Sequence, residues 1–196
     1  MAALPNIGLI GRLRSGKDTI ADYLADDEGY GYLRYAFGDG IRDICRRLYP
    51  DQFADGAKPR ALLQQFGEYA RTHDRDVWVN DMFRRIRNNE YSRYSPVVVS
   101  DVRQLHEVEA LKSRGYVLIR VEAPEALRIQ RAVSSGDRFN LRDLTHGTET
   151  ALDDYAADFT VTNDADLAHL YRQIDEIIDS LRSPENERQL SGSDAA

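Results

Sequence analysis

The stretch from Gly8 to Ala25 reads GLIGRLRSGKDTIADYLA, and it decides the fold. Gly11, Gly16 and Lys17 match the pattern G-x-x-x-x-G-K-[ST], but Asp18 stands where the pattern has Ser or Thr. An apolar run precedes the first glycine, and apolar residues recur at helical spacing after the lysine. A strand before and a helix after are the context in which this pattern forms a phosphate-binding loop.

The chemistry of this loop is anion binding. Glycines let successive backbone N–H groups turn towards one anion, the helix start adds a positive dipole end, and the lysine reaches the β- and γ-phosphates. The alternative is an ordinary glycine turn with a solvated lysine and no bound ligand. We predict a nucleoside triphosphate site made of Gly11, Arg14, Ser15, Gly16, Lys17, Asp18 and Thr19.

The residue Asp18 allows two interpretations. A carboxylate is a hard oxygen ligand and can hold Mg²⁺ directly or through water. Alternatively, Asp18 is only a favourable acid in the first turn of a helix. Thr19 remains available to bond an α-phosphate oxygen.

The composition indicates one domain of a cytoplasmic protein. Of 196 residues, 42% are hydrophobic and 30% charged, which is ordinary for a globular chain with a sizeable core. The net charge of −7 disfavours non-specific nucleic-acid binding, which needs a basic surface. The lone Cys45 excludes an internal disulfide, and the N-terminus lacks the features of a signal peptide or membrane span. We therefore expect no membrane partner and no stable nucleic-acid partner.

Strand-like and helix-like segments alternate along the chain. We expect strands at 7–10, 32–37, 96–103, 116–123 and 158–163, and helices from 17 and at 41–49, 60–74, 77–89, 107–114, 124–133 and 167–181. Residues 51–59 and 134–147 read as irregular, and 183–196 as a disordered tail. This alternation predicts an α/β fold with a parallel sheet of about five strands and helices on both faces. Ligands of such sheets bind beyond the carboxyl ends of the strands.

The motif SDVR at 100–103 ends the most hydrophobic strand. Asp101 can hold Mg²⁺ through water or accept the proton of a nucleophile. The Arg103 guanidinium can donate two parallel hydrogen bonds to a phosphate. An ion pair at the strand end is the structural alternative.

The helix at 60–74 carries polar residues suited to an acceptor. Gln64 can read a base edge and Arg71 can bind a phosphate. Gly67 costs about 1 kcal/mol relative to Ala inside a helix, which is tolerable if a substrate or another helix approaches closely. Trp78 can line a base pocket or pack in the core, and Asp39 can bind the acceptor sugar or base.

Four arginines, Arg128, Arg131, Arg138 and Arg142, bracket the irregular segment at 134–147. Arginines on a mobile flap can close over phosphates and exclude water. A solvated helix face explains Arg128 equally well, so we select Arg131 and Arg138. The scattered histidines suggest no zinc site, and there is no G-x-S-x-G elbow.

Several separated segments agree with one family. They are SGKDT at 15–19, YAFGDGIRD at 35–43, LLQQFGEYAR at 62–71, VVVSDVRQLHEVEAL at 97–111, and HGTE followed by DFTVTNDADLAHL. The chain resembles the phage-type deoxynucleoside monophosphate kinases of the P-loop nucleotide-kinase superfamily, from residue 6 to about 180. That family also carries Asp-Thr after the loop lysine.

The resemblance implies a three-layer P-loop kinase fold over 1–182, with acceptor-binding helices at about 38–92 and a lid at about 131–147. It implies a transferase that uses ATP and Mg²⁺ to phosphorylate a deoxynucleoside monophosphate, and a homodimer is common among such enzymes. The implied catalytic residues are Lys17, Asp101, Arg103, Arg131 and Arg138, with Asp18 and Asp101 at the metal. The implied acceptor residues are Asp39, Arg42, Gln64, Gly67, Arg71, Trp78, Asp101 and Arg103. Gly38, Arg42, Gly147 and Thr148 depart from the family pattern and put the base preference in question.

Three other functions compete with this one. Dephospho-CoA kinases and phosphomevalonate kinases place the same parts on the same architecture. A non-catalytic ATP-binding module is disfavoured, because a pure binder needs no second phosphate site. A nucleic-acid end kinase is disfavoured by the net charge of −7.

Overall fold

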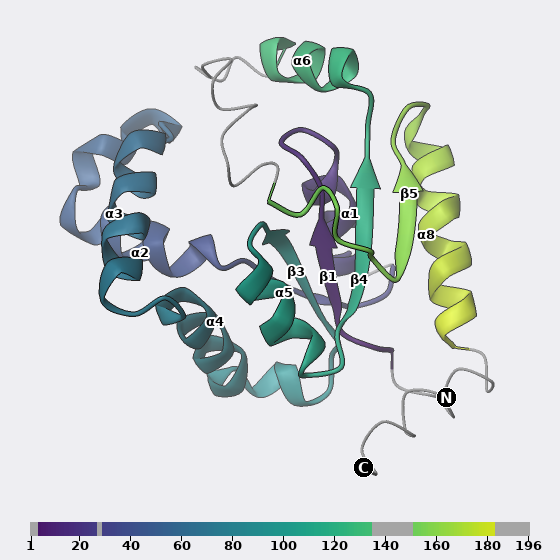
Figure 1. Cartoon of the computed structure of the whole chain (residues 1–196), viewed down its shortest axis with the longest axis horizontal. Helices are drawn as coiled ribbons and strands as arrows, with labels where there is room; N and C mark the ends of the chain where they lie inside the picture. The colour runs from purple at the N-terminus through teal and green to yellow at the C-terminus, as the bar shows by residue number, and fades with distance from the viewer. Residues whose placement is uncertain (1–3, 27–28, 135–150, 183–196) are drawn as a thin grey trace. The chain divides into compact units, whose positions relative to one another are not determined.

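The computed structural model describes residues 4–26, 29–134 and 151–182. Its strands are β1 (Ile7–Ile10), β2 (Leu33–Tyr35), β3 (Val97–Val102), β4 (Val117–Glu122) and β5 (Phe159–Thr162). They form one sheet in the order β2-β3-β1-β4-β5 (Figure 1), and the pairs β1–β3, β1–β4 and β4–β5 are parallel. The predicted α/β architecture with a five-stranded parallel sheet is confirmed.

The helices are α1 (Lys17–Ala25), α2 (Gly38–Leu48), α3 (Arg60–His73), α4 (Val77–Asn88), α5 (Leu105–Lys112), α6 (Glu125–Ser134) and α8 (Leu167–Leu181). Two 3₁₀ segments are η1 (Pro50–Gly56) and η2 (Glu90–Arg93). The polar loop predicted at 51–59 contains short 3₁₀ turns in η1, interrupted by non-helical backbone at Ala54 and Asp55.

Two helices begin earlier than the sequence pattern predicts. The α2 helix starts at Gly38, and the Asp39 carboxylate accepts a hydrogen bond from the Ala36 N–H at 3.0 Å just before it. The α5 helix starts at Leu105, because Gln104 and Glu107 form a reciprocal capping box. The capping box of α5 satisfies backbone N–H groups that a helix start leaves unpaired, whereas at α2 the Asp39 carboxylate ties the first turn to the residue before the N-cap.

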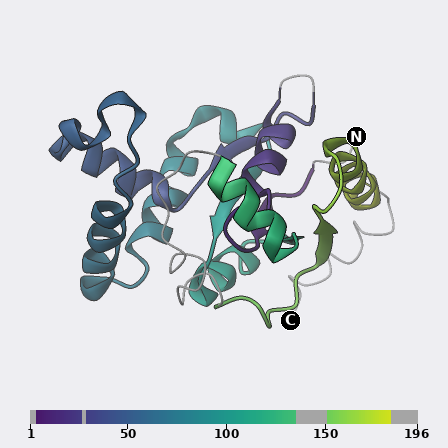
Figure 2. The same ribbon diagram turned by 90° about the horizontal axis from the view of Figure 1, so that it is seen from above.

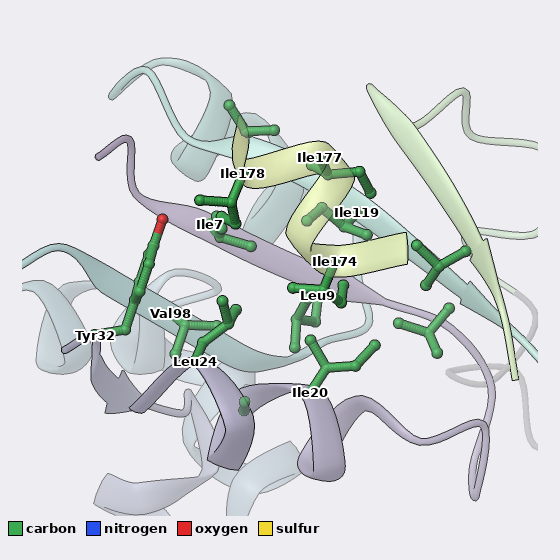
Figure 3. Packing of buried hydrophobic residues seen from close by; sticks show 14 of the residues in the cluster. Ile7, Leu9, Ile20, Leu24, Tyr32, Val98, Ile119, Ile174, Ile177 and Ile178 are labelled. Carbon is green, nitrogen blue, oxygen red and sulfur yellow. The ribbon is translucent and has the colours of Figure 1, made fainter. Parts of the chain in front are cut away.

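Apolar side chains cover both faces of the sheet. On one face α1 and α8 pack against β1 and β4; Figure 3 shows Ile20, Leu24, Ile174, Ile177 and Ile178 around Ile7, Leu9 and Ile119. On the other face lies α5, where Leu111 approaches so closely that a Cβ at Gly8 would lie 2.9 Å from its Cδ1. Figure 1 shows α5 in front of the sheet and α1 behind it. The sheet therefore forms the middle of three layers.

Contacts between Cα atoms divide the chain into two compact units. One comprises the residues up to Arg34 and those from Ser95 onward, which include the phosphate loop. The other comprises residues 35–94, whose helices enclose a small core of Ile41, Cys45 and Trp78. Within the described ranges, no helix combines the length and apolar character needed to cross a membrane.

Candidate active site

The loop between β1 and α1 has backbone angles that few residues tolerate. Gly11 and Gly16 have φ values of 146° and 111°, and Arg14 takes a left-handed φ of 62°. A Cβ at Gly11 would lie 2.4 Å from the Val121 carbonyl oxygen, so β4 leaves no room for a side chain there. Glycine is required at both ends of this loop for conformation and for space.

Three consecutive carbonyl groups of the loop, those of residues 13–15, are held by side chains from outside it. Arg128 donates to Leu13 O at 3.4 Å, Arg131 to Arg14 O at 3.5 Å, and Asn163 to Ser15 O at 2.8 Å. In a planar trans peptide the C=O and the next N–H point in opposite directions. Holding these carbonyls therefore turns the following N–H groups away from the three side chains. The Ser15 N–H donates to Arg12 O at 3.1 Å, whereas the Gly16 N–H points into the loop, as in an anion-binding concavity.

The side chains inside the loop are also fixed. Lys17 is buried, and its ammonium donates to Gly11 O and Arg12 O at 2.5 and 2.9 Å. Ser15 is 1% exposed, and its hydroxyl oxygen has no hydrogen-bond partner among the described residues. Since a buried hydroxyl without a partner costs about 1–3 kcal/mol, this site invites a polar ligand or water.

Asp18 lies at the start of α1 and is 79% exposed at its side chain. Arg34 of β2 forms ion pairs with both Asp18 and Asp22, one helical turn apart. The sequence pattern did not single out Arg34. Its guanidinium links the Asp18 and Asp22 carboxylates of α1 to β2.

Asp101 and Arg103 lie at the carboxyl end of β3, as predicted. Val102 is in register with Ile10 of β1, so Asp101 reaches the same edge of the sheet as the loop. The Arg103 N–H donates to the Glu107 carboxylate at 2.7 Å, which ties its backbone to α5. The structure thus brings together the predicted strand-end residues and the phosphate loop.

These residues fit a magnesium ion carried in by a nucleotide. Within the described part of the chain, no three His, Cys, Asp or Glu side chains gather as a metal site. Mg²⁺ in kinases takes only one or two carboxylates together with substrate phosphates and waters. Asp18 and Asp101 can supply such carboxylates.

The α6 helix lies beyond the carboxyl ends of the strands (Figures 1 and 2). Arg128 is only 4% exposed, so the alternative of a solvated helix face is wrong for it. Arg131 donates to Asn163 and to the loop, and burial lowers the pKa of its guanidinium from the ordinary value. An arginine nevertheless stays charged at neutral pH. Arg138, Arg142 and the predicted lid from 135 onward lie outside the described residues.

A cavity of about 440 Å³ adjoins the loop. Its lining includes Gly11, Arg12, Ser15, Arg120, Glu122, Glu125, Arg128, Thr162 and Asp164. This volume is within the range of small-molecule sites. Its lining carries charges of both signs and includes three residues of the phosphate loop.

In the unit of residues 35–94, the predicted acceptor residues fall into two groups. Asp39 and Arg42 form an ion pair of 2.7 Å on α2. Gln64 and Arg71 lie on α3, where the Gln64 amide donates to Glu68 at 3.2 Å. The Arg71 Nε is buried and has no hydrogen-bond partner among the described residues.

Gly67 and Trp78 have structural roles in that unit. A Cβ at Gly67 would lie 2.9 Å from Ile41 Cδ1, so the glycine admits the side chain of another helix. Trp78 is 4% exposed, and its indole N–H donates to Gly67 O at 3.1 Å. Of the alternatives weighed for these two residues, helix packing and core packing are what the structure shows.

The sequence profile of deoxynucleotide monophosphate kinases matches residues 54–174, more than half of the 196 residues. The chain belongs to this family. The predicted resemblance, the kinase class and the type of acceptor are therefore confirmed, and the family membership implies a small nucleotide substrate.

Individual relatives agree with this membership. A protein of Acanthamoeba polyphaga mimivirus, provisionally named a deoxynucleotide monophosphate kinase, is 26% identical over 207 residues, covering 89% of this chain and 96% of the relative. The deoxynucleotide monophosphate kinase of Enterobacteria phage T4 is 28% identical over 163 residues, covering 82% of this chain. The match spans only 60% of the phage protein's length.

The fold recurs in solved kinases. A gluconokinase from Sinorhizobium meliloti 1021 superposes with a TM-score of 0.57 over 92% of this chain and 97% of its own, at 19% identity. At this identity the likeness concerns the fold alone, and it confirms the P-loop kinase architecture.

Proposed function

We propose that the chain binds ATP in the loop of residues 11–19 and transfers its γ-phosphate to a deoxynucleoside 5′-monophosphate. An oxygen of the acceptor phosphate attacks the γ-phosphorus, and the bond from that phosphorus to the β,γ-bridging oxygen breaks. The products are ADP and the deoxynucleoside diphosphate. Family membership supports the acceptor class.

The observation that carries the donor half of this proposal is the loop itself. The carbonyls of residues 13–15 point outward onto Arg128, Arg131 and Asn163, and buried Lys17 lies across the loop. The Gly16 N–H points into the loop, and this N–H and the Lys17 ammonium are the groups proposed to bind the β- and γ-phosphates. Such a site stabilises the charge that develops on phosphate oxygens in the transition state.

Other residues of this unit complete the donor site. We assign Asp18 and Asp101 to a bound Mg²⁺ and Thr19 to an α-phosphate oxygen. Mg²⁺, when bound, screens the phosphate charges that would otherwise repel an anionic acceptor. Arg103 and Arg131 supply further positive charge, and Arg138 is proposed for the same role from its place in the sequence.

For the acceptor we assign residues of α2 and α3. Arg71 binds the acceptor phosphate, Gln64 contacts the base, and the Asp39–Arg42 pair contacts the nucleoside. The buried, unpaired Nε of Arg71 supports this role, because a fold tolerates such a cost where the guanidinium serves a ligand. Trp78 and Gly67 shape the unit that carries these side chains.

The test is acceptor-dependent ADP release by the full chain with ATP and Mg²⁺. The deoxynucleoside monophosphates should stimulate release, while dephospho-CoA and phosphomevalonate should not. Lys17→Ala and Arg71→Ala should each abolish most of the stimulated rate. Wild-type rates in both variants would refute the assigned site, and stimulation by dephospho-CoA alone would refute the acceptor class.

Lys112→Ala is the matched control for the lysine substitution. Lys112 ends α5 and pairs with Asp158 at 2.9 Å, next to the first residues of β4. It thus lies at the opposite end of the sheet from the loop. This variant should retain the wild-type rate, so that a loss in Lys17→Ala reports the site rather than the loss of any lysine.

The predicted cytoplasmic location and homodimer stay predictions. Light scattering of the purified chain distinguishes a monomer from a dimer.

A further inference from the structure

Asn163 connects three parts of the donor site, and no sequence pattern singled it out. It follows the last residue of β5 and is 5% exposed. Its backbone N–H donates to Glu122 O at 2.7 Å, which extends the pairing of β5 with β4. The sheet therefore fixes the backbone from which this side chain projects.

The two ends of the Asn163 amide bind different partners. Nδ2 donates to Ser15 O at 2.8 Å, and Oδ1 accepts from Arg131 Nη2 at 2.9 Å. The same Nη2 also donates to the backbone oxygen of Asn163 at 3.1 Å. A carbonyl only accepts and a guanidinium only donates, so this network permits one orientation of the amide.

Gly16 and Asn163 also occupy adjoining space. A Cβ at Gly16 would lie 2.1 Å from Nδ2 of Asn163. The asparagine thus fills the volume that a glycine at this position leaves open. Because Nδ2 holds the Ser15 carbonyl, the N–H of Gly16 in the same planar peptide points the opposite way, into the loop.

We propose that Asn163 is a positioning residue for phosphoryl transfer. Through Ser15 it aims an anion-binding N–H at the nucleotide, and through its two bonds to Arg131 it orients the guanidinium beside the loop. This inference rests on the proposed function, because it presupposes that the loop binds ATP.

Substitutions of Asn163 separate the two contacts. Asn163→Asp keeps an acceptor for Arg131 but sets an oxygen against the Ser15 carbonyl, whereas Asn163→Ala removes both contacts. Both variants should weaken ATP binding by roughly ten- to a hundredfold, measured by calorimetry with ATP and Mg²⁺ on the full chain. If Asn163→Ala does not fold, the isosteric Asn163→Asp decides the same question.

Gln173 provides a matched control. Its amide also spans a donor and an acceptor, binding Thr162 O and Thr162 N at 2.8 and 2.9 Å, one residue before Asn163. Within the described part of the chain, none of its hydrogen bonds reaches the loop. Gln173→Ala should lower the thermal midpoint without weakening ATP binding. If Gln173→Ala loses as much ATP affinity as the Asn163 variants, then destabilising β5 is by itself enough to weaken ATP binding, and the proposal is overturned.

A double-mutant cycle tests the second contact. Arg131→Ala should lower kcat in the wild type and equally in Gln173→Ala, but by less than about threefold in Asn163→Ala, because the guanidinium is already misplaced there. Full additivity with Asn163→Ala would overturn this contact.

The failure of this inference can be distinguished from the failure of the proposed function. If the wild type binds ATP but phosphorylates no deoxynucleotide, the acceptor half of the proposed function fails, while the ATP affinities of the variants still test the role of Asn163. If the wild type binds no ATP, both fail.

Discussion

Arg131 donates two hydrogen bonds to Asn163, one to the side-chain oxygen at 2.9 Å and one to the backbone oxygen at 3.1 Å. The two residues come from α6 and from the end of β5, and both also bind carbonyls of the phosphate loop. The loop is therefore shaped from outside as well as by its own glycines. Each prediction below follows from one of these local relationships.

Gly16→Ala should destabilise the chain more than Gly115→Ala. Both glycines have positive φ, 111° and 73°, and forcing an alanine into such a conformation costs about 1–2 kcal/mol. At Gly115 nothing lies within 4 Å of the added Cβ, whereas at Gly16 the Asn163 amide lies 2.1 Å away. Urea unfolding measures the difference in the free energy of unfolding between the two variants. Equal losses of stability would show that the Asn163 side chain moves aside at no free-energy cost. Only Gly16→Ala should also weaken ATP binding.

Asp18→Ala should raise the Mg²⁺ concentration needed for half-maximal rate by about tenfold, as expected for the loss of one charged ligand contact. The control is Asp22→Ala, because Arg34 pairs with Asp22 in the same way, one turn further along α1. Kinetic titration with MgCl₂ at fixed ATP measures the effect. The same Mg²⁺ dependence in both variants would make Asp18 an ordinary acid of the first helical turn.

Arg71→Met should raise KM for the deoxynucleotide by about tenfold or more and leave KM for ATP unchanged. It should not lower the thermal midpoint, because it removes a buried guanidinium nitrogen that has no partner in the described structure. Arg75→Met, at an exposed position four residues later, serves as the control. A lower midpoint with an unchanged acceptor KM would assign Arg71 to packing instead.

Stability should fall at alkaline pH through Tyr23 of α1 and Tyr30 of the following turn, which both contact Asp175 of α8. The hydroxyls of Tyr23 and Tyr30 both donate to the Asp175 carboxylate at 2.7 Å. This hydrogen bond, followed by burial, raises the pKa of Tyr23 from 10.0 to about 12, and burial followed by the same bond raises the pKa of Tyr30. The folded state thus prefers neutral tyrosine, so its contribution is complete below pH 10 and is lost as pH rises towards 12.

The measurement is the free energy of unfolding in urea at pH 9 and pH 11. Tyr23→Phe should reduce the loss between these two values, whereas Tyr94→Phe, at a tyrosine that is 88% exposed, should leave it unchanged. An equal loss in all three proteins would mean that other groups govern alkaline unfolding.

The phosphate loop and the order of strands and helices could be predicted because both depend on residues that are close together in the sequence. The glycines, the lysine and the flanking apolar runs lie within Gly8–Ala25, and every predicted strand and helix has a counterpart. The start of α2 was missed because Gly38 and Gly40 disfavour helix, while the Asp39 contact that supports it depends on geometry.

The surroundings of the loop could not be predicted in the same way. Helical spacing placed Arg128 and Arg131 together, but which side is buried depends on the packing of α6 over the loop. Arg34 and Asn163 reach the loop only through the folding of the sheet. The position of Asn163 directly after a strand was the one available signal, since ligands of parallel sheets bind at that edge.

The most direct test of the central claim is the transfer of labelled γ-phosphate from ATP to a panel of dAMP, dGMP, dCMP, dTMP and their ribose counterparts. Chromatography of the products identifies where the label goes. We predict labelled diphosphate from at least one deoxynucleotide with the wild-type chain, and none with Lys17→Ala. Label that stays in ATP or appears only as free phosphate with every acceptor would contradict the account.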